Sequence, residues 1–338
     1  MNTVAHSSAN EIVLSGLSGG NLLAFLTAVG TLRTVSLAMP DENVRMSWRP
    51  LGGAWRPVLH FRSSTSAEKL LETLAKVFEP FQNSPGTHPA MLWHHWVPRN
   101  TWQRLAAKPG RPDAPLWKQW LDEGEALQTA VTGSSSGSFL GNRERVDWLA
   151  GIGTESALAE GEDSDSVFRA PRSDYFIGNL LNIIANTGTA HVDKALFKPW
   201  AYDDPMDNLS LKFDASEDRR YALQWSAPSG DPDRKKRGNM LGASRLAIEA
   251  LPHFPTVVDG TRLATTGFTG KRSTREFTWG LWDAPARLDT VRTLLALADL
   301  RVTAPDTHRL RASGIAAIFR CRRETIGKTR IFTPARAI

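Results

Sequence analysis

The stretch of residues 22–39 constrains the fold more than any other part of this sequence, because it is the longest apolar segment. Its apolar residues recur at helical spacing and Pro40 follows directly, which predicts a helix that begins near Asn21 and ends at Met39. Threonines, a glycine and Arg33 interrupt the segment, so it predicts a buried helix and not a membrane span.

A glycine-rich stretch, "GLSGGN" at 16–21, lies between this helix and the apolar run 12–14, which we expect to form a strand. The stretch lacks the lysine of a P-loop and the spacing of a dinucleotide fingerprint. Asn21 is a residue type that caps helix N-termini. We therefore predict a helix start. A nucleotide site is the less favoured alternative, since a helix N-terminus can attract a phosphate.

Patterns elsewhere predict an α+β fold with mixed helices and antiparallel sheets. The pair "VRMSW" and "AWRPVLHF" predicts a β-hairpin, and Ser66 is expected to cap the next helix. Further helices are expected at 175–188 (ended by Gly188), 242–254 and 284–300, and strands at 209–214, 220–226, 276–282, 315–323 and 329–334. These elements would form one large domain or two closely packed subdomains. The latter would be a Trp-rich N-terminal one at 1–135 and a basic C-terminal one at 136–338.

The chain has a single cysteine, Cys321, which excludes an internal disulfide and a cysteine-rich zinc site. Its place in the alternating pattern "IAAIFRCRR" predicts a buried side chain. The N-terminus lacks a charged region followed by an apolar one, so we expect no signal peptide and a cytoplasmic protein. No motif indicates a cofactor or a metal site.

Positive charge is concentrated in the last third of the sequence. Residues 231–338 hold 20 Lys and Arg against 10 Asp and Glu, whereas the remainder holds 21 basic and 25 acidic residues. Charge distributed in this way indicates a polyanionic partner for the C-terminal part.

Three basic groups in this last third are the candidate nucleic-acid contacts. The first lies in a predicted loop, the second in "TGKRSTR" and the third in "FRCRRETIGKTR". They comprise Arg234, Lys235, Lys236 and Arg237; Lys271, Arg272 and Arg275; and Arg320, Arg322, Arg323, Lys328 and Arg330. Asn239 and Arg245 follow the first group and can make bidentate hydrogen bonds, so we expect them to reach base edges.

Two other interpretations remain open. Asp203, Asp204 and Asp207 could hold a divalent cation in a metal-dependent nuclease, although their spacing is not that of a calcium loop and a solvated loop is favoured. In the second interpretation, the five tryptophans at 93–120 would dock a partner protein, and the chain would be a structural adaptor without nucleic-acid contact. We expect most of these tryptophans to be buried, because exposing them together would create a large apolar patch.

Two segments carry a resemblance to a known group of proteins. They are "LSGLSGGNLLAFLTAVGTLR" with the following "VRMSWRPLGGAWRPVLH", and "SEDRRYALQWSAPSGDPDRKKRGNMLGASRLAIEALPHFP". Both resemble proteins encoded in type I CRISPR loci of the G subtype, formerly called U. The likeness runs over most of the chain but is dense only at 14–60 and 214–255. It extends both to the large subunit of such loci and to the smaller accessory protein that accompanies the nuclease-helicase.

This resemblance implies a non-catalytic subunit of an RNA-guided surveillance (Cascade) complex. In such complexes the large subunit touches the short motif beside the target, opens the duplex and contacts the nuclease-helicase, while guide pairing reads the sequence. The implied partners are target double-stranded DNA, guide RNA, the backbone subunit and the nuclease-helicase. The loop at 16–21 would then contact the guide RNA or a neighbouring subunit.

Overall fold

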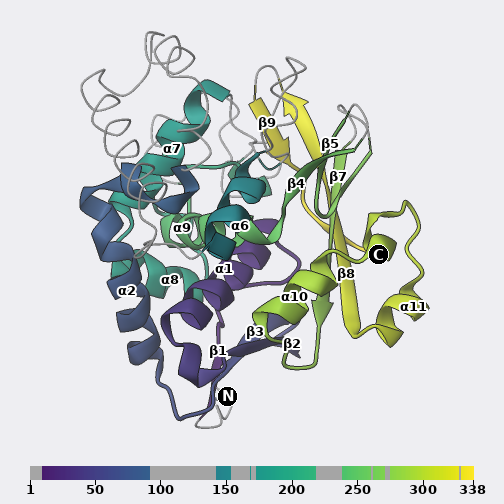
Figure 1. Cartoon of the computed structure of the whole chain (residues 1–338), viewed down its shortest axis with the longest axis horizontal. Helices are drawn as coiled ribbons and strands as arrows, with labels where there is room; N and C mark the ends of the chain where they lie inside the picture. The colour runs from purple at the N-terminus through teal and green to yellow at the C-terminus, as the bar shows by residue number, and fades with distance from the viewer. Residues whose placement is uncertain are drawn as a thin grey trace.

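The structure is a computed structural model that describes residues 10–91, 142–153, 168, 173–217, 238–259, 262–270, 275–326 and 329–338. It has the α+β fold expected from the sequence, with helices packed against antiparallel sheets (Figure 1). The boundary expected between 135 and 136 lies outside the described residues. Buried residues from both sides of it belong to one hydrophobic core. Within the described parts of the chain, no helix is both long and apolar enough to cross a membrane.

Two buried helices cross at the centre of the molecule. They are α1 (Leu22–Ala38), which is buried along its first fourteen residues, and α9 (Leu241–Ala250), which is buried throughout. Gly30 allows their close approach, because a Cβ atom at this position would lie 1.8 Å from the carbonyl oxygen of Leu246. Thr27 adds a polar contact, since its hydroxyl donates to the carbonyl oxygen of Ala243 at 3.1 Å. The predicted buried helix is thereby confirmed.

A three-stranded antiparallel sheet lies at the bottom of Figure 1. Its order is β1 (Glu11–Val13), β3 (Ala54–His60) and β2 (Arg45–Leu51). The connection between β2 and β3 has Gly52 and Gly53 at φ 59° and 78°, which suits a two-residue hairpin turn. The predicted hairpin is therefore confirmed.

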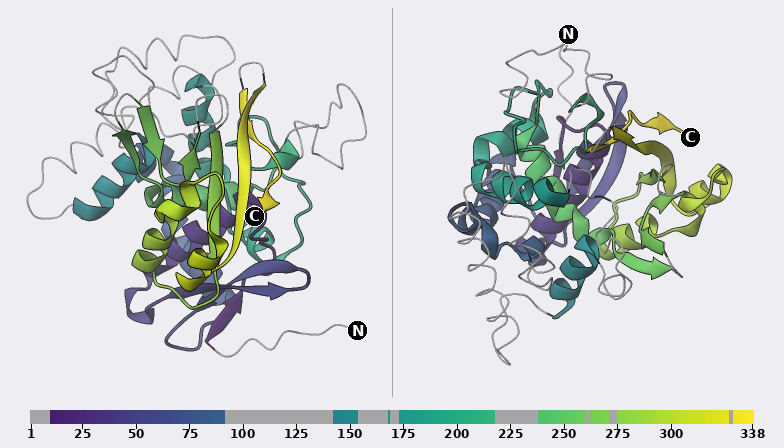
Figure 2. Two further views of the ribbon diagram at one scale, coloured as in Figure 1. Left: turned by 90° about the vertical axis from the view of Figure 1, so that its right-hand side faces the viewer. Right: turned by 90° about the horizontal axis from the view of Figure 1, so that it is seen from above.

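A larger antiparallel sheet is formed by the C-terminal part, and Figure 2 (left) shows its long strand β8 in yellow. Its order is β10 (Arg336–Ala337), β8 (Ile315–Ile326), β7 (Arg275–Trp282) and β6 (Phe268–Thr269), and β9 (Thr329–Phe332) also pairs with β8. A separate hairpin consists of β4 (Thr256–Asp259) and β5 (Arg262–Thr265).

The two faces of the larger sheet differ. One packs aromatic side chains, Phe277 and Trp279 among them, into the main core. It also holds the buried Cys321 as predicted, and burial raises the pKa of that thiol. The other face, here called the outer face, is covered at one end by α11 (Thr307–Ala312) and by a short 3-10 turn, which pack a small second core on Ile315 and Ile318.

The remaining helices surround the central pair, with three of them on the left in Figure 1. They are α2 (Ala67–Asn83), α6 (Asn142–Ile152), α7 (Ser173–Asn186), α8 (Thr189–Phe197) and α10 (Leu288–Leu295). Ser66 caps α2 as predicted, accepting a hydrogen bond from the backbone N–H of Lys69. Gly188 does not end α7 as expected, because it is the N-cap position of the next helix, α8.

Two expected elements differ from the structure. Residues 209–214 do not form a strand, because Asn208 and Lys212 adopt left-handed φ values of 57° and 62° that break an extended run. The helix expected at 284–300 is shorter, since Ala286 pairs with Met46 of β2 as an isolated β-bridge and keeps the chain extended there.

Candidate nucleic-acid interface

The outer face of the C-terminal sheet carries three arginines around one carboxylate. Glu276 of β7 pairs directly with Arg322 of β8, and Arg336 of β10 pairs with Arg320 of β8. The guanidinium nitrogens of Arg320, Arg322 and Arg336 lie 3.6, 3.9 and 3.8 Å from the carboxylate oxygens of Glu276. These separations are ion-pair contacts beyond the usual hydrogen-bond length, so one carboxylate is shared by three cations.

Two of these arginines are accessible and one is not. The side chains of Arg322 and Arg336 are 53% and 68% exposed, whereas that of Arg320 is 2% exposed. Arg320 donates hydrogen bonds to the carbonyl oxygens of Thr303 and Val302 at 2.7 and 2.6 Å. Its expected role as a nucleic-acid contact is therefore corrected, because its guanidinium holds the 302–303 segment onto the sheet.

The other predicted cations of β7 to β9 differ from Arg322 in the direction or the exposure of their side chains. Arg323 is 6% exposed and lies on the core side of β8, because alternate residues of a strand face opposite ways. Its expected contact with nucleic acid is corrected for the same reason as that of Arg320. Arg275, opposite Arg323 in register, and Arg330 are half-buried. Arg322 is thus the member of this group that the structure leaves most open.

The remaining predicted cations lie outside the described residues. They are Arg234, Lys235, Lys236, Arg237, Lys271, Arg272 and Lys328. The last three of these cations are flanked by the start of β7, the end of β8 and the start of β9. These strand ends lie at the same end of the sheet, because Arg275 pairs with Arg323 and Ile326 pairs with Thr329. Gly238, which follows the first four, donates its backbone N–H to the carbonyl oxygen of Tyr202.

Asn239 does not reach toward a ligand as expected, because it is buried and fully bonded. Its amide nitrogen donates to the carbonyl oxygens of Leu209 and Pro205 at 2.6 and 3.3 Å. Its amide oxygen accepts from the backbone N–H of Met240 and the hydroxyl of Ser244 at 2.8 and 3.1 Å. The side chain therefore fixes the start of α9 to the 205–209 segment.

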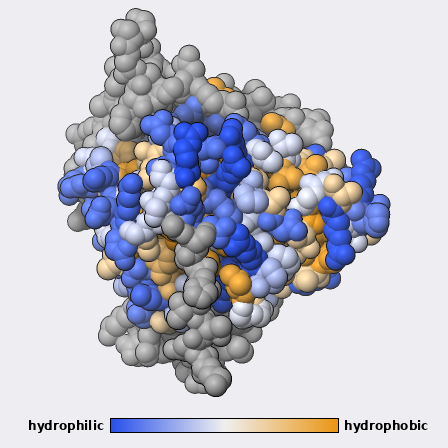
Figure 3. Space-filling model, turned by 90° about the horizontal axis from the view of Figure 1, so that it is seen from below, coloured by the Kyte–Doolittle hydropathy of each residue, from blue (hydrophilic) through white to orange (hydrophobic). Residues whose placement is uncertain are grey.

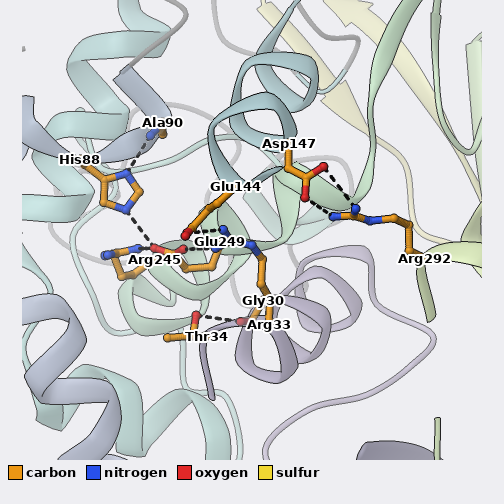
Figure 4. A network of polar contacts seen from close by, with 10 residues as sticks. All are labelled: Gly30, Arg33, Thr34, His88, Ala90, Glu144, Asp147, Arg245, Glu249 and Arg292. Carbon is orange, nitrogen blue, oxygen red and sulfur yellow. Dashed lines mark hydrogen bonds and ion pairs between the residues drawn. The ribbon is translucent and has the colours of Figure 1, made fainter. Parts of the chain in front are cut away.

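Arg245 is also corrected, since its side chain is wholly buried in the ion network drawn in Figure 4. It donates to the carboxylate of Glu249 at 2.5 Å, one helical turn along α9, and its guanidinium lies 4.0 Å from the ring of Phe78. Glu249 also contacts Arg33 at 3.0 Å and His88 at 2.9 Å. Each of these groups is committed to a partner inside the protein.

The network perturbs the titration of its members. Burial alone would raise the pKa of Glu249, but Arg245, His88 and Arg33 outweigh it and hold that pKa well below its usual value. Burial lowers the pKa of His88 to about 4 against the opposing carboxylate of Glu249. Arg33 extends the network to Glu144 of α6 at 2.9 Å, beside a mostly apolar pocket of about 320 Å³.

The acidic cluster considered for a metal site is occupied by a lysine. The ammonium group of Lys194 lies 2.6 Å from Asp203 and 2.5 Å from Asp204. The second oxygen of Asp204 accepts the backbone N–H of Leu241 at 2.7 Å. Asp207 is exposed in the following turn. Among the described residues, no group of three or more His, Cys, Asp and Glu is placed to hold a metal ion.

The glycine-rich loop at 16–21 is a helix start, as predicted. The side-chain oxygen of Asn21 accepts the backbone N–H of Ala24 at 2.9 Å. Gly16 donates its N–H to the carbonyl oxygen of Leu196 at 2.8 Å, and a Cβ atom on it would lie 2.5 Å from the carbonyl oxygen of Ala195. The loop therefore packs against the end of α8, and its glycine permits that contact.

Arg336 and Glu276 were not singled out from the sequence. Arg336 stands alone in "TPARAI", so no cluster of charge marks it. Its proximity to Arg322 depends on β10 pairing beside β9 along the same edge of β8. In the sequence, the alternation of Arg320 and Arg322 indicates that both side chains lie on one face of β8. It does not indicate which of the two is covered by a neighbouring loop.

Comparisons of the chain with models of protein families, with curated proteins and with solved structures find no match. The family suggested by the two resembling segments therefore stays a proposal.

Proposed function

We propose that this chain is a non-catalytic nucleic-acid-binding subunit of a type I CRISPR effector complex, contacting target DNA and, in addition, guide RNA. The resemblance of the two segments at 14–60 and 214–255 supports this choice of family. The single observation that carries the ligand class is the pair of exposed arginines, Arg322 and Arg336, on the outer face of the C-terminal sheet.

The charge balance of this face supports a phosphate ligand. Three guanidinium groups share the carboxylate of Glu276, and Arg322 and Arg336 are only at ion-pair distance from it. Their N–H groups stay available for a ligand with more acceptor oxygens. A planar guanidinium donates two parallel hydrogen bonds to a phosphate, which makes arginine well suited to nucleic-acid backbones.

Contacts of this kind fit the role of a subunit that does not read sequence by itself. Phosphate contacts position a protein on nucleic acid but carry no base information directly. In an RNA-guided complex the guide supplies that information by pairing. The proposed partners are therefore target double-stranded DNA, guide RNA, the backbone subunit and the nuclease-helicase.

The proposal is tested by removing the two exposed charges. The variant Arg322→Gln/Arg336→Gln is compared with Lys69→Gln/Lys76→Gln, which removes two exposed cations from α2. Binding of labelled duplex DNA and single-stranded RNA is measured by fluorescence anisotropy across a salt series. We expect the first variant to lower the slope of log K against log salt by about 1–2 on duplex DNA, at about 0.9 per lost phosphate contact.

The control variant should leave the slope unchanged. Failure of the wild-type chain to bind either nucleic acid would refute the proposal, and equal effects of both variants would remove this face from it. Co-purification with neighbouring operon products, followed by sequencing of bound nucleic acid, tests membership of the complex.

A further inference from the structure

The outer face of the N-terminal sheet carries a second set of cations. Alternate residues of a strand share a face, which places one set of side chains together on this sheet. They are Glu11 of β1; Arg45, Ser47 and Arg49 of β2; and Arg56, Val58 and His60 of β3. Figure 3, seen from the end of the molecule where this sheet lies, shows strongly hydrophilic side chains gathered there. No sequence cluster indicated this surface, because its arginines are separated along the chain.

Two arginines of this face oppose each other directly across the strands. Arg49 pairs directly with Arg56, and Arg45 pairs directly with His60. Like charges directly opposite each other destabilise an antiparallel pair. Burial lowers the pKa of His60 despite the nearby carboxylate of Glu11, so its ring is neutral at pH 7 and adds no further charge. The sheet thus tolerates two directly opposed arginines, and Arg45 adds a third cation to the same face.

One carboxylate compensates only part of this charge. Glu11 receives two hydrogen bonds from Arg49, both of 2.7 Å, and contacts the Nδ1 atom of His60 at 3.1 Å. Among the described residues, no carboxylate lies within ion-pair distance of Arg45 or Arg56. Arg56 instead donates to the carbonyl oxygen of Leu17 at 2.6 Å, which fixes its guanidinium beside the glycine-rich loop.

The contact between Ser47 and His60 supports this arrangement. Ser47 does not act as a nucleophile. The hydroxyl of Ser47 lies 2.9 Å from the Nε2 atom of His60, whose Nδ1 atom faces Glu11. That order of groups is typical of a hydrolase triad. The side chain of Ser47 is fully buried, however, so a substrate does not reach its oxygen. The chain of contacts orients Glu11 and, through it, Arg49.

We infer that this face is a second phosphate-binding surface, which contacts a nucleic-acid backbone separately from the C-terminal sheet; this rests on the function proposed above. All three of its cations are arginines, whose planar fork matches a phosphate. Arg45 and Arg49 are four residues apart on one strand, about 13 Å, and therefore reach phosphates several nucleotides apart. The face lies at the bottom of Figure 1 and the C-terminal sheet at its right, so the two surfaces serve different stretches of backbone.

The test removes Arg45 and Arg56, the two arginines of this face without a carboxylate partner among the described residues. In Arg45→Gln/Arg56→Gln the contacts among Glu11, Arg49 and His60 stay intact. We expect the slope of log K against log salt to fall by up to about 1.8 on duplex DNA and about 1.4 on single strands, for two lost contacts. Arg45→Lys/Arg56→Lys keeps the charge, so it should keep most of the slope while weakening affinity at every salt concentration.

The controls separate this inference from the proposed function. Lys69→Gln/Lys76→Gln removes the same charge elsewhere, and an equal effect of that control would overturn the inference. If the wild-type chain binds and Arg322→Gln/Arg336→Gln lowers the slope while Arg45→Gln/Arg56→Gln does not, the second surface alone is disproved. If the wild-type chain does not bind, both proposals fail. Combining the two arginine pairs should give additive losses, because distant sites act independently.

Discussion

Gly30 of α1 lies against the backbone of Leu246 in α9, where a Cβ atom would come within 1.8 Å of the carbonyl oxygen. Helix backbones cannot move apart locally without opening the core around them, because interiors are close-packed. This glycine therefore sets the separation of the two central helices.

Gly30→Ala should be strongly destabilising for this reason. We expect a loss of more than about 3 kcal/mol in the free energy of unfolding, at or beyond the upper end of overpacking effects. Urea unfolding followed by tryptophan fluorescence measures it. Gly188→Ser is the matched control, because a Cβ atom there meets nothing closer than 3.9 Å and serine is a good N-cap. A near-neutral Gly30→Ala would mean that α1 and α9 are not packed as described.

Glu249→Gln tests the buried ion network. The substitution leaves Arg33 and Arg245 buried with one carboxylate fewer, and breaking a buried pair from one side costs about 3–5 kcal/mol. Thermal unfolding should show a lower Tm than in Glu72→Gln, which neutralises an exposed glutamate of α2. Equal Tm values for the two variants would contradict the central place of Glu249.

The network also gives stability a specific pH dependence. The pKa of His88 is about 4 in the folded protein, and burial holds the pKa of His253 well below its usual value. The unfolded chain therefore binds protons that the folded one excludes, and stability falls as pH drops from about 6.5 toward 4. His88 alone accounts for roughly 3 kcal/mol of this loss. The depressed pKa of Glu249 adds a further loss only below its ordinary value near 4.5.

His253→Leu separates the two histidines. Neither ring nitrogen of His253 has a hydrogen-bond partner in the part of the chain that the structure describes, so an apolar residue of similar size should not lower stability at pH 7. The slope of unfolding free energy between pH 6.5 and 4 should become shallower, as measured by urea titrations at several pH values. An unchanged slope would show that His253 does not titrate with folding.

Local signals account for the parts of the fold that the sequence predicted well. Asn21 and Ser66 cap helices through their own side chains, and Gly52 with Gly53 closes a hairpin, so neighbours in the chain decide each outcome. The strand expected at 209–214 failed because distant contacts decide its conformation. Asn179 of α7 and Asn239, both far away in the sequence, donate side-chain hydrogen bonds to the carbonyl oxygens of Ser210 and Leu209.

The sequence predicts that the site is rich in basic residues, but it does not predict where on the fold the site lies. A count of charges finds the basic last third, yet burial decides which cations are available. Arg245 could have been recognised as structural, because Glu249 follows it at the spacing of an ion pair within a helix. Arg336 could not have been placed at the site from the sequence, since its partners Glu276 and Arg320 come from other strands.

The basic segment 234–237 and Asn239 should separate cleanly by mutation, although they are almost adjacent in sequence. Replacing the four cations with alanine should lower the slope of log K against log salt by roughly 2–4 on duplex DNA, weaken different sequences alike and leave the Tm nearly unchanged. Asn239→Ala should do the reverse. It leaves the buried backbone N–H of Met240 and the buried hydroxyl of Ser244 without their acceptor, which costs roughly 1–3 kcal/mol, while removing no charge. Paired anisotropy and thermal unfolding measurements decide the matter, and a lower salt slope in Asn239→Ala at unchanged Tm would restore Asn239 as a direct contact.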